Sequence, residues 1–143
     1  MTSHQVRRTI VQMRILADTN AFLAVALDEP EKSWLLQATK GVELAAPAIL
    51  PYEVGNALSA LVKRKRLGAD EAAEAWQVIQ SIPVELVEVD IPASLLLAAE
   101  HGIYAYDAYF LQCAMRLKCP LLTLDRAMAS VARAMRIKLV EKP

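Results

Sequence analysis

Four acidic residues stand at positions from which their side chains could act on one substrate: Asp18, Glu53, Asp107 and Asp125. Two of them, Asp18 and Asp125, directly follow short apolar runs at residues 14–17 and 121–124, and such runs are typical of buried strands. In open α/β sheets, ligands bind outside the carboxyl ends of the strands. We therefore expect these two carboxylates to share one rim of a sheet.

The other two acids, Glu53 and Asp107, are predicted to point inward from helices. Asp107 precedes Phe110 by three residues and Glu53 follows Leu50 by three, so each acid shares a helical face with an apolar side chain. Carboxylates that gather in a poorly solvated site either bind protons or require a cation. The pattern therefore predicts a divalent cation among the four acids.

The donor set indicates which cation this is. Oxygen ligands without histidine or cysteine partners favour Mg²⁺ or Mn²⁺ over zinc, and His4 and His101 are isolated. With such an ion the expected chemistry is phosphodiester hydrolysis, in which the metal activates a water molecule and neutralises charge on the phosphate. Taken singly, each acid also fits a plainer role as a helix cap, a first-turn residue or a surface acid. The four together favour the metal site.

Alternating strands and helices must position these acids. Strands are predicted at residues 14–17, 42–46, 84–89, 121–124 and 137–140. Helices are predicted at residues 20–27, 48–66, 92–102 and 105–117, with others capped at Asp28, opening at Asp70 and following Asp125. This order indicates an α/β fold in which a parallel sheet carries helices on both faces.

Length and composition indicate one domain. The chain has 143 residues, 55% of them hydrophobic, which is enough for a single core. Met13 directly precedes the first strand, so residues 1–12 are interpreted as an N-terminal extension or an alternative start, and residues 13–143 as the domain. Cys113 and Cys119 match neither a zinc pair nor a disulfide framework, which indicates reduced thiols. With no secretory signal and no apolar run of roughly 18 residues, we expect a cytoplasmic protein without membrane contact.

Four short strings carry a resemblance to a known family. Residues 15–20 read ILADTN, residues 51–58 read PYEVGNAL, residues 106–109 read YDAY, and residues 122–125 read LTLD. In this order they resemble the acidic motifs of PIN domains, particularly the VapC-type toxins of toxin–antitoxin pairs. The resemblance implies a three-layer α/β/α sandwich with a mainly parallel sheet, a Mg²⁺- or Mn²⁺-dependent endoribonuclease acting on RNA, a homodimer, and inhibition by a cognate antitoxin protein.

The same resemblance assigns roles to individual residues. Asp18, Glu53 and Asp107 would ligate the metal or orient water, and Asp125 would be a direct or water-mediated ligand. The hydroxyls of Thr19 and Thr123 would orient the acids.

The family pattern also bears on Asn20 and Met128. Asn20 would hold Asp18 or a phosphate, although an ordinary capping role explains Thr19, Asn20 and Thr123 equally well. Met128 departs from the pattern, because an aromatic residue is expected at its position.

The residues other than the four acids carry a modest net positive charge. Twelve acidic residues then oppose sixteen basic ones, a net charge of +4 that suits RNA. Residues 63–66, which read KRKR, could contact phosphates, but cations are favoured at a helix C-terminus in any case. Arg126, beside Asp125, is the basic residue that we favour for substrate binding.

Aromatic and apolar residues allow two interpretations. Tyr104, Tyr106 and Tyr109 could stack on unpaired bases. Trp34, Trp76 and the apolar stretches at residues 58–62 and 95–99 could form a dimer interface or a groove for an antitoxin helix. Core packing is the favoured interpretation for both groups.

Other functions remain open from the sequence. The chain could be a processing nuclease outside any toxin pair. It could also be a phosphate-accepting signalling domain, although paired acids after the first strand and a lysine after the last are missing. A third alternative is an inactive domain that only binds RNA or protein.

Overall fold

The computed structural model describes residues 13–142, which form a four-stranded parallel sheet with the strand order β3-β2-β1-β4. The strands are β1 (Arg14–Ala17), β2 (Glu43–Pro47), β3 (Glu85–Val87) and β4 (Leu121–Leu122). Parallel strands that are covered on both faces read as continuous apolar runs, and Ile15, Leu16 and Ala17 are at most 2% exposed.

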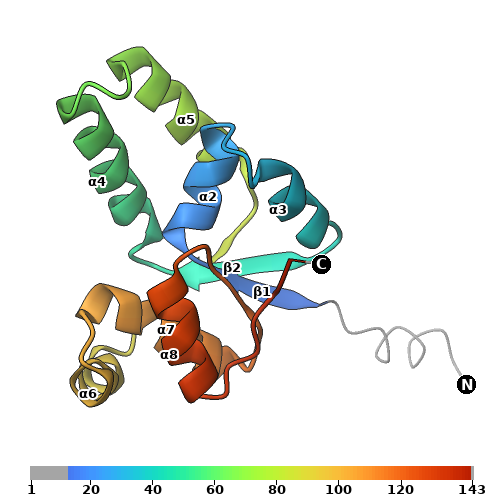
Figure 1. Cartoon of the computed structure of the whole chain (residues 1–143), viewed down its shortest axis with the longest axis vertical. Coiled ribbons are helices and arrows are strands. Elements are labelled where there is room, and N and C mark those ends of the chain that lie inside the picture. The colour runs from blue at the N-terminus through green and yellow to red at the C-terminus, as the bar shows by residue number, and fades with distance from the viewer. Residues whose placement is uncertain (1–12, 143) are drawn as a thin grey trace, which may run out of the picture.

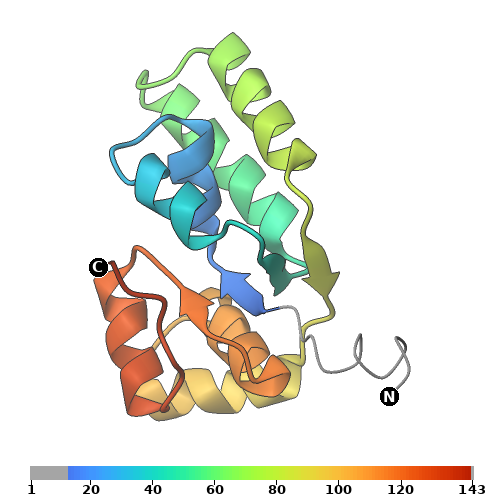
Figure 2. The ribbon, with the colours of Figure 1, turned by 90° about the vertical axis from the view of Figure 1, so that its right-hand side faces the viewer.

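Helices cover both faces of this sheet (Figures 1 and 2). One layer holds α2 (Thr19–Ala26), α3 (Lys32–Ala38), α4 (Leu50–Lys63) and α5 (Ala69–Ser81). The opposite layer holds α6 (Ile91–His101), α7 (Ala105–Leu117) and α8 (Arg126–Ala134). The expected three-layer α/β/α sandwich with a parallel sheet is therefore confirmed.

The strand order reverses between β1 and β4. The chain first builds outward from β1 through β2 to β3, then returns along the second helix layer to place β4 on the free side of β1. Leu16 and Ala17 pair with Leu121 and Leu122, and the Asp18 amide donates to the Leu122 carbonyl (3.1 Å). Because ligands of open α/β sheets bind where the strand order reverses, this junction is the expected place for a site.

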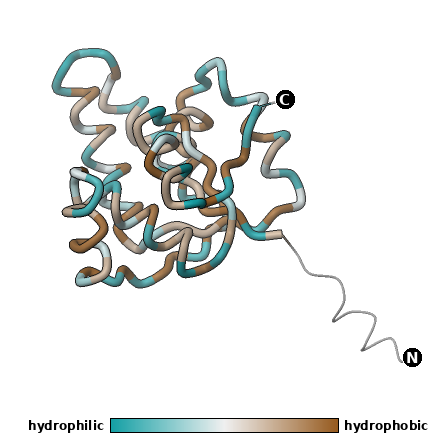
Figure 3. The backbone as a smooth tube through the Cα atoms, turned by 60° about the horizontal axis from the view of Figure 1, so that its bottom comes forward, coloured by the Kyte–Doolittle hydropathy of each residue, from teal (hydrophilic) through white to brown (hydrophobic). Residues whose placement is uncertain are grey.

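The core lies between the sheet and the two layers. Its fully buried side chains include Leu16, Leu35, Phe110 and Leu121. Figure 3 shows hydrophobic stretches running through the centre of the molecule, while hydrophilic stretches lie mostly in outer turns. Within the described residues, no helix has the length and apolar character needed to cross a membrane.

Four element predictions need correction. The expected final strand at residues 137–140 is only a single bridge between Leu139 and Leu121. The expected strands at residues 84–89 and 121–124 contract to β3 and β4. Asp28 does not cap the following helix: it has a φ of 53° and pairs with Lys32, four residues on (2.5 Å), so the helix begins only after Glu31.

The two cysteines are buried free thiols, as predicted. Burial raises the pKa of the Cys113 thiol to about 11 and also raises the pKa of Cys119. Both are therefore neutral and unreactive at physiological pH.

Candidate active site

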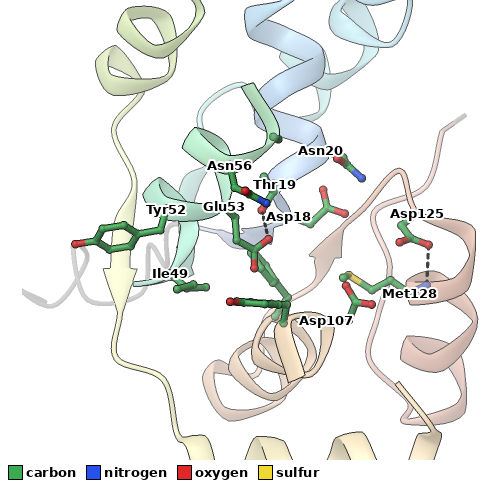
Figure 4. Close-up of a pocket in the computed structure, with 13 residues that line it drawn as sticks. Asp18, Thr19, Asn20, Ile49, Tyr52, Glu53, Asn56, Asp107, Asp125 and Met128 are labelled. Atoms are coloured by element: carbon green, nitrogen blue, oxygen red, sulfur yellow. Dashed lines mark hydrogen bonds between the residues drawn. The ribbon is translucent and has the colours of Figure 1, made fainter. Parts of the chain in front are cut away.

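A cavity of about 320 Å³ opens at the carboxyl ends of β1 and β4 (Figure 4). All four predicted acids, Asp18, Glu53, Asp107 and Asp125, line this cavity. They come from separate parts of the chain and reach the cavity from both helix layers. The other lining residues are Thr19, Asn20, Ile49, Tyr52, Asn56, Ala57, Tyr106, Phe110 and Met128.

Asp18 is the most deeply buried of the four acids, with 3% of its surface exposed. It is the N-cap of α2, where its Oδ1 accepts a hydrogen bond from the Ala21 amide (3.0 Å). Its Oδ2 accepts a short hydrogen bond from the hydroxyl of Thr123. Both carboxylate oxygens are therefore held by bonds from two different elements.

Thr123 joins Asp18 to Asp125. Its Oγ1 donates to Asp18 and accepts from the Asp125 amide (3.0 Å). Asp125 in turn is the N-cap of α8, and its Oδ1 accepts from the amides of Ala127 (2.8 Å) and Met128 (3.1 Å). The predicted orienting role of Thr123 thus has a geometric basis in this chain of hydrogen bonds.

Glu53 lies in the first turn of α4, and Thr19 orients it. The Thr19 hydroxyl donates to Glu53 Oε2 (3.0 Å) across 34 residues of sequence. The other oxygen, Oε1, is buried and receives no hydrogen bond from the described part of the chain. A buried carboxylate oxygen without a partner is unfavourable, and a cation at this position would satisfy it.

Repulsion and burial act together on the acids. The pKa of Asp18 is raised to about 6, chiefly by burial and in smaller part by the nearby carboxylates of Asp125 and Asp107, while the hydrogen bonds from Thr123 and Ala21 act in the opposite direction. Burial also raises the pKa of Glu53 and of Asp107, with additional repulsion from neighbouring acids. No lysine, arginine or histidine of the described residues lines the cavity to offset this charge.

The cavity suits a hard divalent cation by the chemistry of its donors. The four carboxylates, whose oxygens include the buried Glu53 Oε1, supply oxygen ligands of the type that Mg²⁺ and Mn²⁺ prefer. Within residues 13–142, however, no three acidic, histidine or cysteine side chains converge closely enough to ligate one ion together. Side-chain adjustment would therefore have to accompany metal binding.

The remaining predicted substrate contacts lie at or beyond the rim. Asn20 is exposed and lines the cavity. Arg126 is exposed at the first position of α8, next to Asp125, but is not among the lining residues. The basic run at residues 63–66 lies at the far end of α4 from Glu53.

Several apolar and aromatic residues for which core packing was the favoured interpretation are exposed instead. Tyr104 and Tyr106 are 83% and 58% exposed, so core packing was the wrong interpretation for both. Leu95 and Leu96 are likewise exposed on α6. In contrast, Met128 is 6% exposed and belongs to the hydrophobic core, and α8 forms without an aromatic residue at this position.

Sequence reasoning missed Tyr52, Asn56 and Ile49 as cavity residues. Tyr52 and Asn56 are four residues apart and flank Glu53 on α4, whose buried stripe is Leu50, Val54 and Leu58. Helical spacing therefore carried a signal: a stripe beside a functional acid and away from the buried side must face the site or solvent.

The fold and this cavity define a class of protein: a doubly wound parallel α/β sandwich with a carboxylate cluster where its strand order reverses. The PIN domain family matches residues 15–134, and the chain belongs to that family. Its relatives include proteins named as VapC ribonucleases. Ribonuclease VapC3 of Pyrobaculum aerophilum is 30% identical over 122 residues, covering 82% of this chain and 93% of that protein.

Solved structures share the fold. The crystal structure of PAE2754 from Pyrobaculum aerophilum matches with a TM-score of 0.65 and 25% identity, over 83% of this chain and 79% of that one. A toxin-antitoxin complex from Klebsiella pneumoniae matches with a TM-score of 0.54 and 21% identity, over 78% of this chain and 86% of that one. Family membership argues against the phosphate-accepting signalling domain.

Proposed function

We propose that this chain is a Mg²⁺- or Mn²⁺-dependent endoribonuclease and the toxin of a toxin–antitoxin pair. The observation that carries the proposal is the gathering of four carboxylates in one cavity, where residues 13–142 contribute no basic side chain to balance them. Relatives that are named ribonucleases support RNA as the substrate.

The residues that would hold the cation are the four acids. The hydroxyls of Thr123 and Thr19 orient the carboxylates of Asp18 and Glu53. Asp125 uses only Oδ1 for its helix cap, so its Oδ2 is available to the ion. When bound, a divalent cation lowers the pKa of a water molecule and neutralises charge that develops on the phosphate. The four carboxylates would hold the ion near the junction of β1 and β4.

The protein's own groups position the reacting parts. Thr123 and Thr19 restrict the rotamers of Asp18 and Glu53, which reduces the reorganisation needed when substrate binds. The helices α2 and α8 begin at Asp18 and Asp125, so their amide ends point toward the cavity and favour negative charge there. Arg126, exposed beside Asp125, is placed to attract a neighbouring phosphate of the RNA.

A partner protein would control such an activity. The solved Klebsiella pneumoniae neighbour is a toxin-antitoxin complex, and we extend this arrangement to our chain as part of the proposal. A homodimer and a cytoplasmic location belong to the same proposal. A small protein encoded beside this chain that blocks cleavage would identify the antitoxin, whereas its absence would favour the role of a processing nuclease.

The test is cleavage of a cellular RNA pool by the purified chain with Mg²⁺, with Mn²⁺ and with EDTA. We expect cutting with either metal, none with EDTA, and at least a hundredfold loss in Asp18→Asn, on the order of the loss seen when a preorganised electrostatic group is removed. The matched control is Asp90→Asn, because Asp90 also caps a helix through Oδ1 (Ala93 amide, 3.0 Å) but lies outside the cavity. Metal-independent cutting, or normal cutting by Asp18→Asn, would contradict the proposal.

A further inference from the structure

Two exposed tyrosines stand at the mouth of the acidic cavity, Tyr52 from α4 and Tyr106 from α7. We call this pair the aromatic rim. Their side chains are 75% and 58% exposed, although each carries a large apolar ring. The rings therefore contribute little to the core of this chain, and their place beside the acids calls for another explanation.

The α4 helix presents its part of the rim in a regular way. Leu50, Val54 and Leu58 form its buried stripe, while Glu53 lines the cavity one residue before Val54. Tyr52 is one residue further back in this series, so it lies beyond Glu53 on the side away from the core. Figure 4 shows the Tyr52 ring extending outward from α4, across the cavity from Asp125.

The α7 helix supports its part of the rim with a second ring. Tyr109 contacts Tyr106 edge to face, with ring centroids 5.9 Å apart and planes at 89°. Tyr109 is half-buried and so restricts the exposed Tyr106 ring. One turn further on, the buried Phe110 continues the aromatic surface into the cavity. A restrained ring loses less entropy when it stacks on a ligand.

The chemistry of the rim separates it from the site for phosphate. Apart from the four acids, the cavity lining in the described chain carries no charged group, so the aromatic rim offers no cationic side chain to a phosphate. It offers flat apolar rings, and next to Tyr52 the exposed amide of Asn56 supplies both a donor and an acceptor. Proteins commonly recognise unpaired bases by stacking them on aromatic rings and by hydrogen bonds to their edges, and this surface offers both.

We propose that Tyr52 and Tyr106 stack on unpaired bases of the nucleotides that flank the scissile phosphate, with Asn56 hydrogen-bonding a base edge. This inference rests on the proposed ribonuclease function and adds the residues of this chain that would select unpaired nucleotides. Paired bases are stacked on each other and cannot enter the rim. The tyrosines are therefore specificity residues rather than catalytic ones.

The test compares Tyr52→Ala and Tyr106→Ala with Tyr52→Phe, Tyr106→Phe and the control Tyr104→Ala. Tyr104 is also exposed, at 83%, but does not line the cavity. Steady-state cleavage is measured on a single-stranded RNA that contains the site chosen by the wild-type chain. Each alanine variant should raise KM about tenfold with little change in kcat, whereas the phenylalanine variants and the control should stay near wild type.

A modified substrate shows whether the rings act on bases. When the flanking nucleotides are abasic, the alanine variants should no longer differ from wild type, because the rings have nothing to stack on. An equal loss on abasic and normal RNA would overturn the proposal. So would a loss confined to binding of an inhibitory protein, which would make the rim a protein contact.

A binding measurement keeps this inference separate from the proposed function. Fluorescence anisotropy of a labelled, mixed-sequence single-stranded RNA is followed with Asp18→Asn protein, with and without each alanine change. Weaker binding of single-stranded but not duplex RNA supports the rim even if the wild-type chain fails to cut. Normal cutting with unchanged KM and affinity in both alanine variants would overturn the rim and leave the ribonuclease proposal standing.

Discussion

At the scale of single residues, Asp18 shows most clearly how burial and neighbouring carboxylates oppose the ionisation of an acid in this site. It is 3% exposed, caps a helix, accepts from Thr123 and is close to other carboxylates. Its pKa of about 6 lies above its ordinary value of 3.8 because burial penalises the charged form. In the native fold without metal, the protonated form of Asp18 is therefore favoured, and ionisation of Asp18 destabilises the fold.

This raised pKa predicts how Asp18→Asn changes stability with pH. A carboxyl whose pKa rises on folding stabilises the fold below about pH 4, and this contribution is lost as the pH rises through about 6. Asparagine keeps the oxygen that caps Ala21 and carries no charge. In EDTA, the variant should gain up to about 3 kcal/mol over wild type by pH 7.5, from roughly 1.4 kcal/mol per pKa unit.

Urea unfolding from pH 4 to 8 measures this difference. The gain of the variant over wild type should be small at pH 4 and grow to its full value by about pH 7, with Glu53 and Asp107 shifting the absolute curves of both proteins in the same sense. A constant difference across this range would show that Asp18 does not titrate as described.

At the scale of elements, each acid belongs to the start of a helix. Asp18 and Asp125 cap α2 and α8, while Glu53 and Asp107 lie in the first turns of α4 and α7. Helix N-termini carry partial positive charge, which offsets part of the repulsion among the acids. The same residues thus serve the helices and the site, so the capping explanation and the metal-site explanation are compatible.

Capping and metal binding can be separated at Asp125. Asp125→Asn retains an oxygen for the Ala127 and Met128 amides, whereas Asp125→Ala removes it and should lower the free energy of unfolding by about 1 kcal/mol. Both variants should lose metal-dependent cleavage, because neither has a carboxylate at position 125 that could ligate the metal. Thermal unfolding and cleavage are measured on the same samples.

Asp90→Ala provides the control for this pair. It removes a comparable cap from α6 and should lower stability similarly while leaving cleavage unchanged. If Asp125→Asn cleaves RNA as wild type does, Asp125 acts only as a cap.

At the scale of the whole molecule, the site exists because the chain reverses its direction across the sheet. The chain reaches β4, beside β1, only after it has passed through α6 and α7, and this return brings Thr123 within hydrogen-bond distance of Asp18, 105 residues away. Each helix layer contributes an acid to the cavity, Glu53 from α4 and Asp107 from α7 (Figure 4). The cavity is thus held together by the complete fold.

Binding of a cation across this junction should stabilise the whole fold. Mg²⁺ should raise the free energy of unfolding at pH 7.5 by about 2.7 kcal/mol when present at a hundred times its Kd. Thermal melts at constant ionic strength measure this effect, and the melting temperature should rise with Mg²⁺ concentration. Asp18→Asn should show a much smaller rise; an equal rise would indicate general screening of charge rather than a site.

The sequence determined much of the outcome, because the relevant signals are local. Apolar runs ending in acids marked β1 and β4, and helical spacing turned Glu53 and Asp107 inward, so the fold class and the four acids that line the cavity were predictable. The order of four motifs indicated the family. The roles of these acids in metal binding, like the domain limits at residues 1–12, stay predictions.

Only the tertiary structure decided how the acids are held and what surrounds them. The Thr123 bond to Asp18 and the Thr19 bond to Glu53 join distant segments, and no local pattern specifies such pairs. Local patterns do not specify exposure either. Tyr104 and Tyr106 carry large rings of the kind found in protein cores, yet they face solvent because neighbouring elements do not cover them. Periodicity shows which side of a helix is apolar, whereas packing decides which apolar side chains remain uncovered.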